Sequence, residues 1–321
     1  MKKEQRCVVF SVKNKKSLFG GYKSTMSVEE ALQVAPNLTQ FSFDESSSEF
    51  DAESFYNAMI SDFDFLIVGV DGVSGRGFEL DYNEITKTYN IRVATPSTRD
   101  DWYIALEYLS NLAKKLSSDI ATDIDDKKYN SDSILKFDYE KDVMFGLEIM
   151  RENLSGDLQT NINYGVIRPL ALNLVMIDEI LSSSDPIDAY SQKLTQVQYI
   201  DAYSARQRFF RANNSGEIIG LYTLTQGVDT ILPYKPGVEY YNLDTLGGEE
   251  VSQWQLSFVC FDENAQDEES AYFALDPILD YNEVIENLPK DSYKFIDATY
   301  ILVSGLSREV MEHLAEICEK K

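Results

Sequence analysis

Histidine is almost absent from this chain, which has one, His313, in 321 residues. Imidazole is the usual general base near neutral pH and a frequent zinc ligand, so this scarcity argues against most serine and cysteine hydrolases and against common zinc sites. His313 lies at the edge of the apolar face of a predicted C-terminal helix. Cys318 is five residues away, which is not one helical turn, so we expect no Cys–His dyad. We assign no catalytic residue, cofactor or metal ligand.

Cysteine is scarce as well. Cys7, Cys260 and Cys318 are far apart, odd in number and form no Cys-x-x-Cys pair. This pattern argues against a secreted disulfide scaffold and against a structural zinc site. We expect reduced, mostly buried thiols.

Long hydrophobic runs are missing. The longest, Phe63–Val70 and Leu170–Ile177, fall far short of the ~20 residues that a membrane-spanning helix needs. Cys7–Val12 follows a basic start, but it is too short for the hydrophobic region of a signal peptide and fits a first strand better. The sequence therefore predicts a cytoplasmic protein that does not bind membranes.

Basic residues are outnumbered, with 29 lysines and arginines against 54 acidic residues, a net charge of −25 and a pI near 4.3. Such a surface repels nucleic-acid phosphates and attracts cationic partners. Residues 1–23 are the exception, because they hold one acid, Glu4, and seven basic residues: Lys2, Lys3, Arg6, Lys13, Lys15, Lys16 and Lys23. This basic segment is either a solvated hairpin or a docking element for acidic groups or an anion.

Strand and helix patterns alternate without a regular βαβ rhythm, which predicts an α+β fold with mixed, mostly antiparallel sheets and flanking helices. The clearest helix is Arg99–Ser117, with Thr98 as its N-cap. Leu170–Leu181 is apolar throughout, and its pattern does not decide between helix and strand. Phe41–Phe43 and Phe295–Val303 each read as one strand.

The length of the chain favours two lobes over a single core. Residues 118–133 are polar and charged, and they read either as a linker or as a long surface loop. Taking them as the linker predicts an N-terminal α+β lobe over residues 1–120 and a C-terminal α+β lobe over residues 134–321.

The glycine-rich segment Gly69–Gly77 follows a buried strand, as a phosphate-binding loop would. It lacks a Gly-Lys-Ser/Thr ending, and the segment after it, Phe78–Tyr82, reads as a strand. Phosphate loops rely on the free amides of a following helix. We therefore interpret the segment as a strand-to-strand turn.

Two acidic clusters resemble calcium-binding loops only in part. Asp123, Asp125 and Asp126 lack the glycine and closing glutamate of an EF-hand, and the loop that begins at Asp262 has Asp267 where glycine is needed. Both read as solvated loops. The second is the candidate surface for a basic protein partner, through Asp262, Glu263, Asp267, Glu268 and Glu269.

Two aromatic segments remain. Phe209 and Phe210 interleave with three arginines, which in so acidic a protein are expected to pair with carboxylates: Arg206, Arg208 and Arg211. Pro233–Gly237, with Tyr240 and Tyr241 after it, reads either as a rigid turn packed on a sheet or as an exposed aromatic binding edge.

Five segments of the chain resemble an uncharacterised, cytosolic domain-of-unknown-function family of low-GC Gram-positive bacteria. They are Phe10–Phe19, Met26–Leu32, Gly77–Tyr82, Tyr89–Val93 and Thr98–Trp102. The resemblance covers most of the chain and implies a cytosolic location. It carries no catalytic residues, because its motifs are structural.

Three functions stay open. The charge and the absence of a catalytic signature favour a non-enzymatic interaction protein that binds a cationic protein partner, for example an immunity- or antitoxin-like inhibitor. The alternatives are a carboxylate-based hydrolase, with or without a divalent metal, acting in a cleft between two lobes, and a small-ligand sensor with an aromatic pocket.

Overall fold

In the computed structural model the chain divides into two compact units, unit 1 (Met1–Tyr199) and unit 2 (Ile200–Lys321). Both units combine helices with mostly antiparallel sheets, which confirms the α+β prediction. The structure describes residues 7–17, 20–124, 127–156, 158–213, 215–262, 265 and 271–318.

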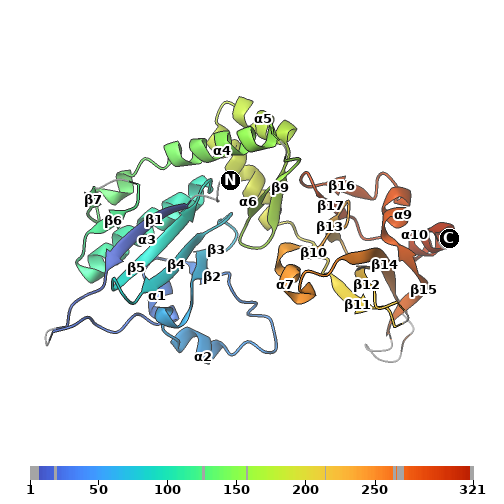
Figure 1. Cartoon of the computed structure of the whole chain (residues 1–321), viewed down its shortest axis with the longest axis horizontal. Coiled ribbons are helices and arrows are strands. Elements are labelled where there is room, and N and C mark those ends of the chain that lie inside the picture. The colour runs from blue at the N-terminus through green and yellow to red at the C-terminus, as the bar shows by residue number, and fades with distance from the viewer. Residues whose placement is uncertain are drawn as a thin grey trace. The chain divides into compact units, whose positions relative to one another are not determined.

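Unit 1 is built on a seven-stranded sheet with the order β2-β3-β4-β5-β1-β6-β7, in which neighbouring strands are antiparallel (Figure 1). In β1 the alternate residues Val8, Phe10 and Val12 are buried, as expected for a strand with one face on the core. The strands are β1 Cys7–Lys13, β2 Leu38–Gln40, β3 Leu66–Val70, β4 Phe78–Asn83, β5 Thr88–Ala94, β6 Ile120–Thr122 and β7 Lys128–Tyr129.

Residues 118–133, where the sequence predicts a linker, lie inside unit 1. β6 pairs with β1, and β7 pairs with β6, so this polar segment extends the sheet. The structure divides the chain after Tyr199 instead, and unit 1 is longer than the predicted lobe 1–120.

Helix α3 packs against β1 and β5 and organises the core of unit 1. Thr98 caps it, accepting a hydrogen bond from the Asp101 amide, as predicted. Its fully buried Trp102 stacks on Phe137, with ring centroids 5.6 Å apart. The helices of this unit are α1 Val28–Leu32, α2 Ala52–Asn57, η1 Ile60–Asp62, α3 Arg99–Leu116, η2 Ile134–Lys136, α4 Glu140–Leu154, α5 Leu174–Ser182 and α6 Pro186–Gln198.

The ambiguous apolar run from Leu170 contains both kinds of element. β8 (Asn161–Tyr164) and β9 (Pro169–Leu172) form a two-stranded antiparallel sheet, and α5 begins immediately afterwards. Asn173 separates them, because its side chain accepts a hydrogen bond from the Met176 amide and caps α5.

Unit 2 contains two four-stranded sheets, with the orders β10-β13-β17-β16 and β11-β12-β14-β15. β10 and β13 are parallel, as are β12 and β14, and the other pairs are antiparallel. The strands are β10 Tyr203–Ser204, β11 Arg208–Arg211, β12 Ile218–Thr225, β13 Thr230–Pro233, β14 Val251–Phe261, β15 Tyr272–Asp280, β16 Tyr293–Phe295 and β17 Tyr300–Val303.

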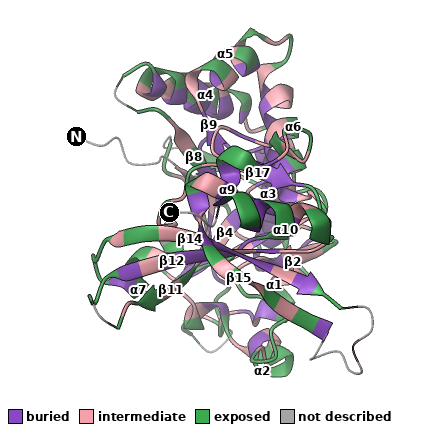
Figure 2. Cartoon of the chain, turned by 90° about the vertical axis from the view of Figure 1, so that its right-hand side faces the viewer, coloured by how far each residue is buried: buried purple, intermediate pink, exposed green. Residues whose placement is uncertain are grey.

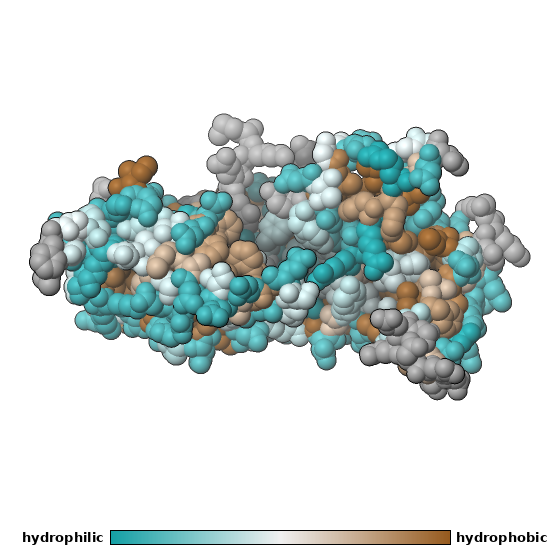
Figure 3. Space-filling model, turned by 90° about the horizontal axis from the view of Figure 1, so that it is seen from below, coloured by the Kyte–Doolittle hydropathy of each residue, from teal (hydrophilic) through white to brown (hydrophobic). Residues whose placement is uncertain are grey.

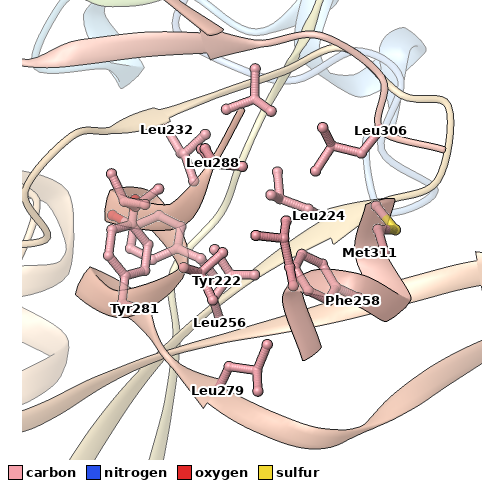
Figure 4. Packing of buried hydrophobic residues seen from close by; sticks show 14 of the residues in the cluster. Tyr222, Leu224, Leu232, Leu256, Phe258, Leu279, Tyr281, Leu288, Leu306 and Met311 are labelled. Carbon is pink, nitrogen blue, oxygen red and sulfur yellow. The ribbon is translucent and has the colours of Figure 1, made fainter. Parts of the chain in front are cut away.

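Helices α9 (Tyr281–Asn287) and α10 (Arg308–Cys318) help to close the core of unit 2, and short helices η3 (Tyr240–Asn242) and α7 (Leu243–Leu246) follow β13. Phe258 and Met311 lie in this core (Figure 4). α10 turns its exposed residues outward, shown in green in Figure 2. Among the described residues, no helix combines the length and apolarity needed to cross a membrane.

Two strand predictions were wrong in detail. Phe41–Phe43 lies just after β2, whose residues pair with β3. Phe295–Val303 forms two strands, β16 and β17, because a turn separates them: the Asp297 carboxylate accepts hydrogen bonds from the amides of Thr299 and Tyr300.

Candidate functional site

A half-buried carboxylate surrounded by phenols is the most distinctive polar group of unit 2. We call it the tyrosine–glutamate cluster, and it consists of Gln207, Tyr222, Glu239, Tyr241 and Tyr300. Tyr222 and Tyr300 belong to strands β12 and β17, whereas Glu239 and Tyr241 belong to the segment after β13. The fold therefore brings together residues that are far apart in the sequence.

Gln207 holds the cluster together through both ends of its amide. Its nitrogen donates to the Tyr222 hydroxyl and to the Gly237 carbonyl, each over 2.6 Å. Its oxygen accepts from the Glu239 amide over 3.1 Å and from the Asn242 side chain over 2.9 Å. These four bonds fix the loop that carries Glu239 against β12.

The carboxylate of Glu239 is held in an environment that favours its neutral form. Burial raises its pKa, and hydrogen bonds from Tyr241, Tyr300 and Tyr222 oppose that shift only in part. The Tyr300 hydroxyl donates to Glu239 Oε1 over 3.4 Å. Burial in turn raises the pKa of all three phenols, so they remain neutral donors.

Tyr281 packs against the cluster but is not part of it. Its ring packs on Tyr222, with centroids 5.2 Å apart (Figure 4), and its hydroxyl donates to the Pro233 carbonyl over 2.5 Å. Tyr241 lies at the outer side of the cluster and is 64% exposed. The cluster thus has the buried Tyr222 and Tyr281 on its inner side and the exposed Tyr241 on its outer side.

The raised pKa of Glu239 predicts that Glu239→Gln stabilises the protein at neutral pH. A carboxyl group whose pKa is higher in the folded state gives stability that is complete below its unfolded pKa and is lost as pH rises through its folded pKa. The neutral amide avoids this loss. We expect the variant to be the more stable by urea unfolding at about pH 8, with a smaller difference at about pH 5.

The matched control is Glu286→Gln, which removes the same charge from an exposed position of α9. Its stability should follow that of the wild type at both pH values. A Glu239→Gln protein less stable than the wild type at both pH values would contradict the prediction.

The glycine-rich segment Gly69–Gly77 is a structural turn, as predicted. The carboxylate of Asp101 accepts hydrogen bonds from the amides of Gly75, Arg76 and Gly77, over 3.1, 2.8 and 2.8 Å. The element that follows is strand β4 and not a helix. The amides that would hold a phosphate in a phosphate loop are therefore bound to the protein's own carboxylate.

Of the acidic loop, Asp262 is described and lies directly after β14, where its amide donates to the Ala271 carbonyl over 2.8 Å. The other four candidate partner-binding residues, Glu263, Asp267, Glu268 and Glu269, lie outside the described residues. The hypothesis that this loop contacts a partner therefore stays a proposal.

The other residues that the sequence singles out lie on helix α10 and strand β11. His313 is exposed on α10, and Cys318 is buried there. Arg211 pairs with Glu249 over 2.7 Å, as expected for this acidic chain, and Phe209 packs on Trp254. Within the described residues, no group of three histidine, cysteine or acidic side chains is arranged to hold a metal ion.

Sequence reasoning pointed to the right loop but missed its central residues. The sequence places Tyr241 in a candidate aromatic edge, but it gives no signal for Glu239 or Gln207. The adjacent Pro236-Gly237 turn was the available signal, because it fixes the direction of the chain just before Glu239. The contact between positions 207 and 239 joins distant segments and has no local signature.

Comparison with known proteins identifies a family but no activity. No curated protein and no solved structure matches the chain. A family model described as a domain of unknown function, DUF4299, matches residues 7–314. The chain belongs to the DUF4299 family.

Proposed function

We propose that this protein binds a cationic protein partner and receives a lysine or arginine side chain of that partner at the tyrosine–glutamate cluster. The net charge of −25 supports this, because it draws basic proteins from a distance and speeds their association. Hydrophilic side chains cover most of the face drawn in Figure 3. The cluster would supply the specific contact that long-range attraction lacks.

The observation that carries the proposal is the state of Glu239. Burial raises the pKa of Glu239 against hydrogen bonds from three phenols, and Arg206, a basic side chain near the cluster, acts to lower the pKa of Tyr241. A half-buried carboxylate whose hydrogen bonds come from neutral phenols is less favourable than one that also pairs with a cation. An ammonium or guanidinium group from a partner would offset the cost of burying this charge and form a charge-assisted hydrogen bond.

The tyrosines suit the same ligand. Lysine and arginine cations are attracted to the faces of aromatic rings, by about 0.5–2 kcal/mol depending on exposure. Tyr241 is exposed and stands beside Glu239, so a partner side chain would meet a ring and a carboxylate together. Tyrosine is also a common centre of protein interfaces.

A more specific version of the proposal is an immunity- or antitoxin-like inhibitor that covers the basic cleft of a nuclease-type toxin. The acidic loop that begins at Asp262 would be a second contact, through the remaining candidates Glu263, Asp267, Glu268 and Glu269. Contacts of this kind mainly raise the rate of association.

The test measures binding of a fluorescein-labelled hexalysine peptide by anisotropy at low salt. We expect Glu239→Gln to weaken binding about tenfold, because the charge-assisted contact is lost. Glu286→Gln removes the same charge from an exposed site and should change affinity less than about twofold. Equal losses in both variants, or no binding by the wild type, would refute a specific cation site.

A second candidate is a carboxylate-based hydrolase, and one observation favours it: burial raises the pKa of Glu239, as a general acid requires. Glycoside hydrolysis normally needs a second carboxylate about 5–10 Å away. Asp297 lies near Tyr300, but its carboxylate accepts hydrogen bonds from the Thr299 and Tyr300 amides and so stabilises a turn. Binding is therefore the better-supported function. Turnover of aryl glycosides or aryl phosphates by the wild type, abolished in Glu239→Gln, would reverse this order.

A further inference from the structure

Three lysines line one cavity of about 610 Å³ in unit 1, although the protein as a whole is strongly acidic. They are Lys15, Lys23 and Lys115, and Glu30 is the acidic residue beside them. The volume lies within the range of about 300–1,000 Å³ that is usual for small-molecule sites. The local balance of charge is thus opposite to that of the chain.

The fold positions these lysines from two distant parts of the chain. Lys15 and Lys23 belong to the segment between β1 and α1, and the Lys23 amide donates to the Lys15 carbonyl over 2.9 Å. An antiparallel bridge between Lys16 and Tyr22 holds the two sides of this segment together. Lys115 comes from the last turn of α3, and its ammonium donates to the Glu30 carbonyl over 3.3 Å.

Neutral polar residues complete the lining of the cavity. The hydroxyl of Tyr89, a fully buried side chain, accepts from the Met26 amide over 2.7 Å. Burial raises the pKa of Tyr89 to about 12, so the phenol keeps its proton at neutral pH. Ser24 and Thr25 line the same cavity, and the Thr25 hydroxyl shares a hydrogen bond of 3.0 Å with that of Ser61.

Asn14 anchors the backbone segment that carries Lys15 and Lys23. Its side-chain nitrogen donates to the Lys23 carbonyl over 2.9 Å and to the Tyr82 hydroxyl over 3.3 Å. Asn14 is itself buried, so the backbone that carries Lys15 and Lys23 is anchored to the sheet. The lysines therefore project from a fixed frame.

We propose that this cavity binds a small, soluble, phosphate-bearing molecule. Three ammonium groups attract the charge of a phosphate, and charge-assisted hydrogen bonds from lysine to phosphate oxygens are strong. The exposed Ser24 hydroxyl would donate to one of the remaining oxygens or to a polar group of the ligand. The acidic surface elsewhere disfavours long nucleic acids, which selects for a small ligand.

The experiment titrates the full chain with sodium pyrophosphate by calorimetry at low ionic strength. We expect one saturable site whose affinity falls with added salt. Lys15→Gln with Lys23→Gln should weaken binding at least about tenfold, and Lys115→Gln, from a different element, should weaken it as well. Lys290→Gln is the matched control, because it removes an exposed lysine of unit 2.

Three results would overturn the proposal: no binding of pyrophosphate, an equal loss of affinity in Lys290→Gln, or binding only to vesicles that carry a phosphorylated lipid headgroup. The lysine variants should bind the hexalysine peptide no more weakly than the wild type. The outcome at this cavity is therefore separate from the outcome at the tyrosine–glutamate cluster.

Discussion

Asp101→Asn is expected to lower the free energy of unfolding of unit 1 by about 3 kcal/mol or more. One Asp101 oxygen accepts from the amides of Gly75 and Gly77. The other accepts from the Arg76 amide, the Ser97 hydroxyl and the Thr98 amide, all in a buried site. An asparagine NH₂ at either position would face donors, leaving buried groups without acceptors.

Asp100→Asn is the matched control. Asp100 is exposed and precedes Asp101 in the first turn of α3, so this change removes the same charge from the same helix end. We expect a change within about 0.5 kcal/mol. Urea unfolding followed by hydrogen exchange of the amides of residues 75–77 would localise the effect, since these amides should exchange faster only in Asp101→Asn. Similar losses in the two variants would contradict the assigned role.

Phe258→Ala should destabilise unit 2 by about 3–5 kcal/mol. Phe258 is 1% exposed and belongs to the core cluster of unit 2, which also contains Leu224, Leu256 and Met311 (Figure 4). Truncation removes the ring and leaves a cavity in the middle of β14, a strand with partners on both sides that has little freedom to collapse.

Phe261→Ala provides the comparison on the same strand. Phe261 is 38% exposed, and its ring packs on Tyr272, on the neighbouring strand, at 5.4 Å. We expect a loss of about 1 kcal/mol or less. Circular dichroism during urea unfolding measures both variants. A Phe258→Ala loss no larger than that of Phe261→Ala would mean that Phe258 is not central to the core.

The elements with strong local signals were predictable. Helix α3 has a capping threonine, an acidic first turn, a basic last turn and apolar residues at helical spacing, so several independent effects agree. Strands β11 and β12 follow one another in the chain and pair antiparallel. Both depend on interactions between residues close in sequence.

The failures share a physical cause. An edge strand and a linker are both polar, so residues 118–133 gave no sign that β6 and β7 extend the sheet. At Asn173 and Asp297 a single polar side chain changes the direction of an apolar run. Each of these residues was a usable turn or cap signal, but it was outweighed by its hydrophobic neighbours.

The candidate site was less predictable than the fold. Glu239 draws its character from burial, which depends on β12 and β17 arriving from other parts of the chain. The lysine-lined cavity was partly anticipated, since the basic N-terminal segment was evident in the sequence. Its third lysine, Lys115, comes from α3. The sequence indicated only that this lysine is a basic residue at the end of a helix, not that it lines a cavity.

The loop that carries Glu239 connects the two sheets of unit 2 and contains no strand of either. Residues 234–250 connect β13 in one sheet to β14 in the other and belong to neither ladder, while Gln207, Tyr222 and Tyr300 hold the loop from outside it. We expect a change in the length or sequence of this segment to leave the strand registers of both sheets intact, because it contains no strand of either sheet. If unit 2 binds the proposed partner, grafting this one contiguous segment would exchange the specificity of binding.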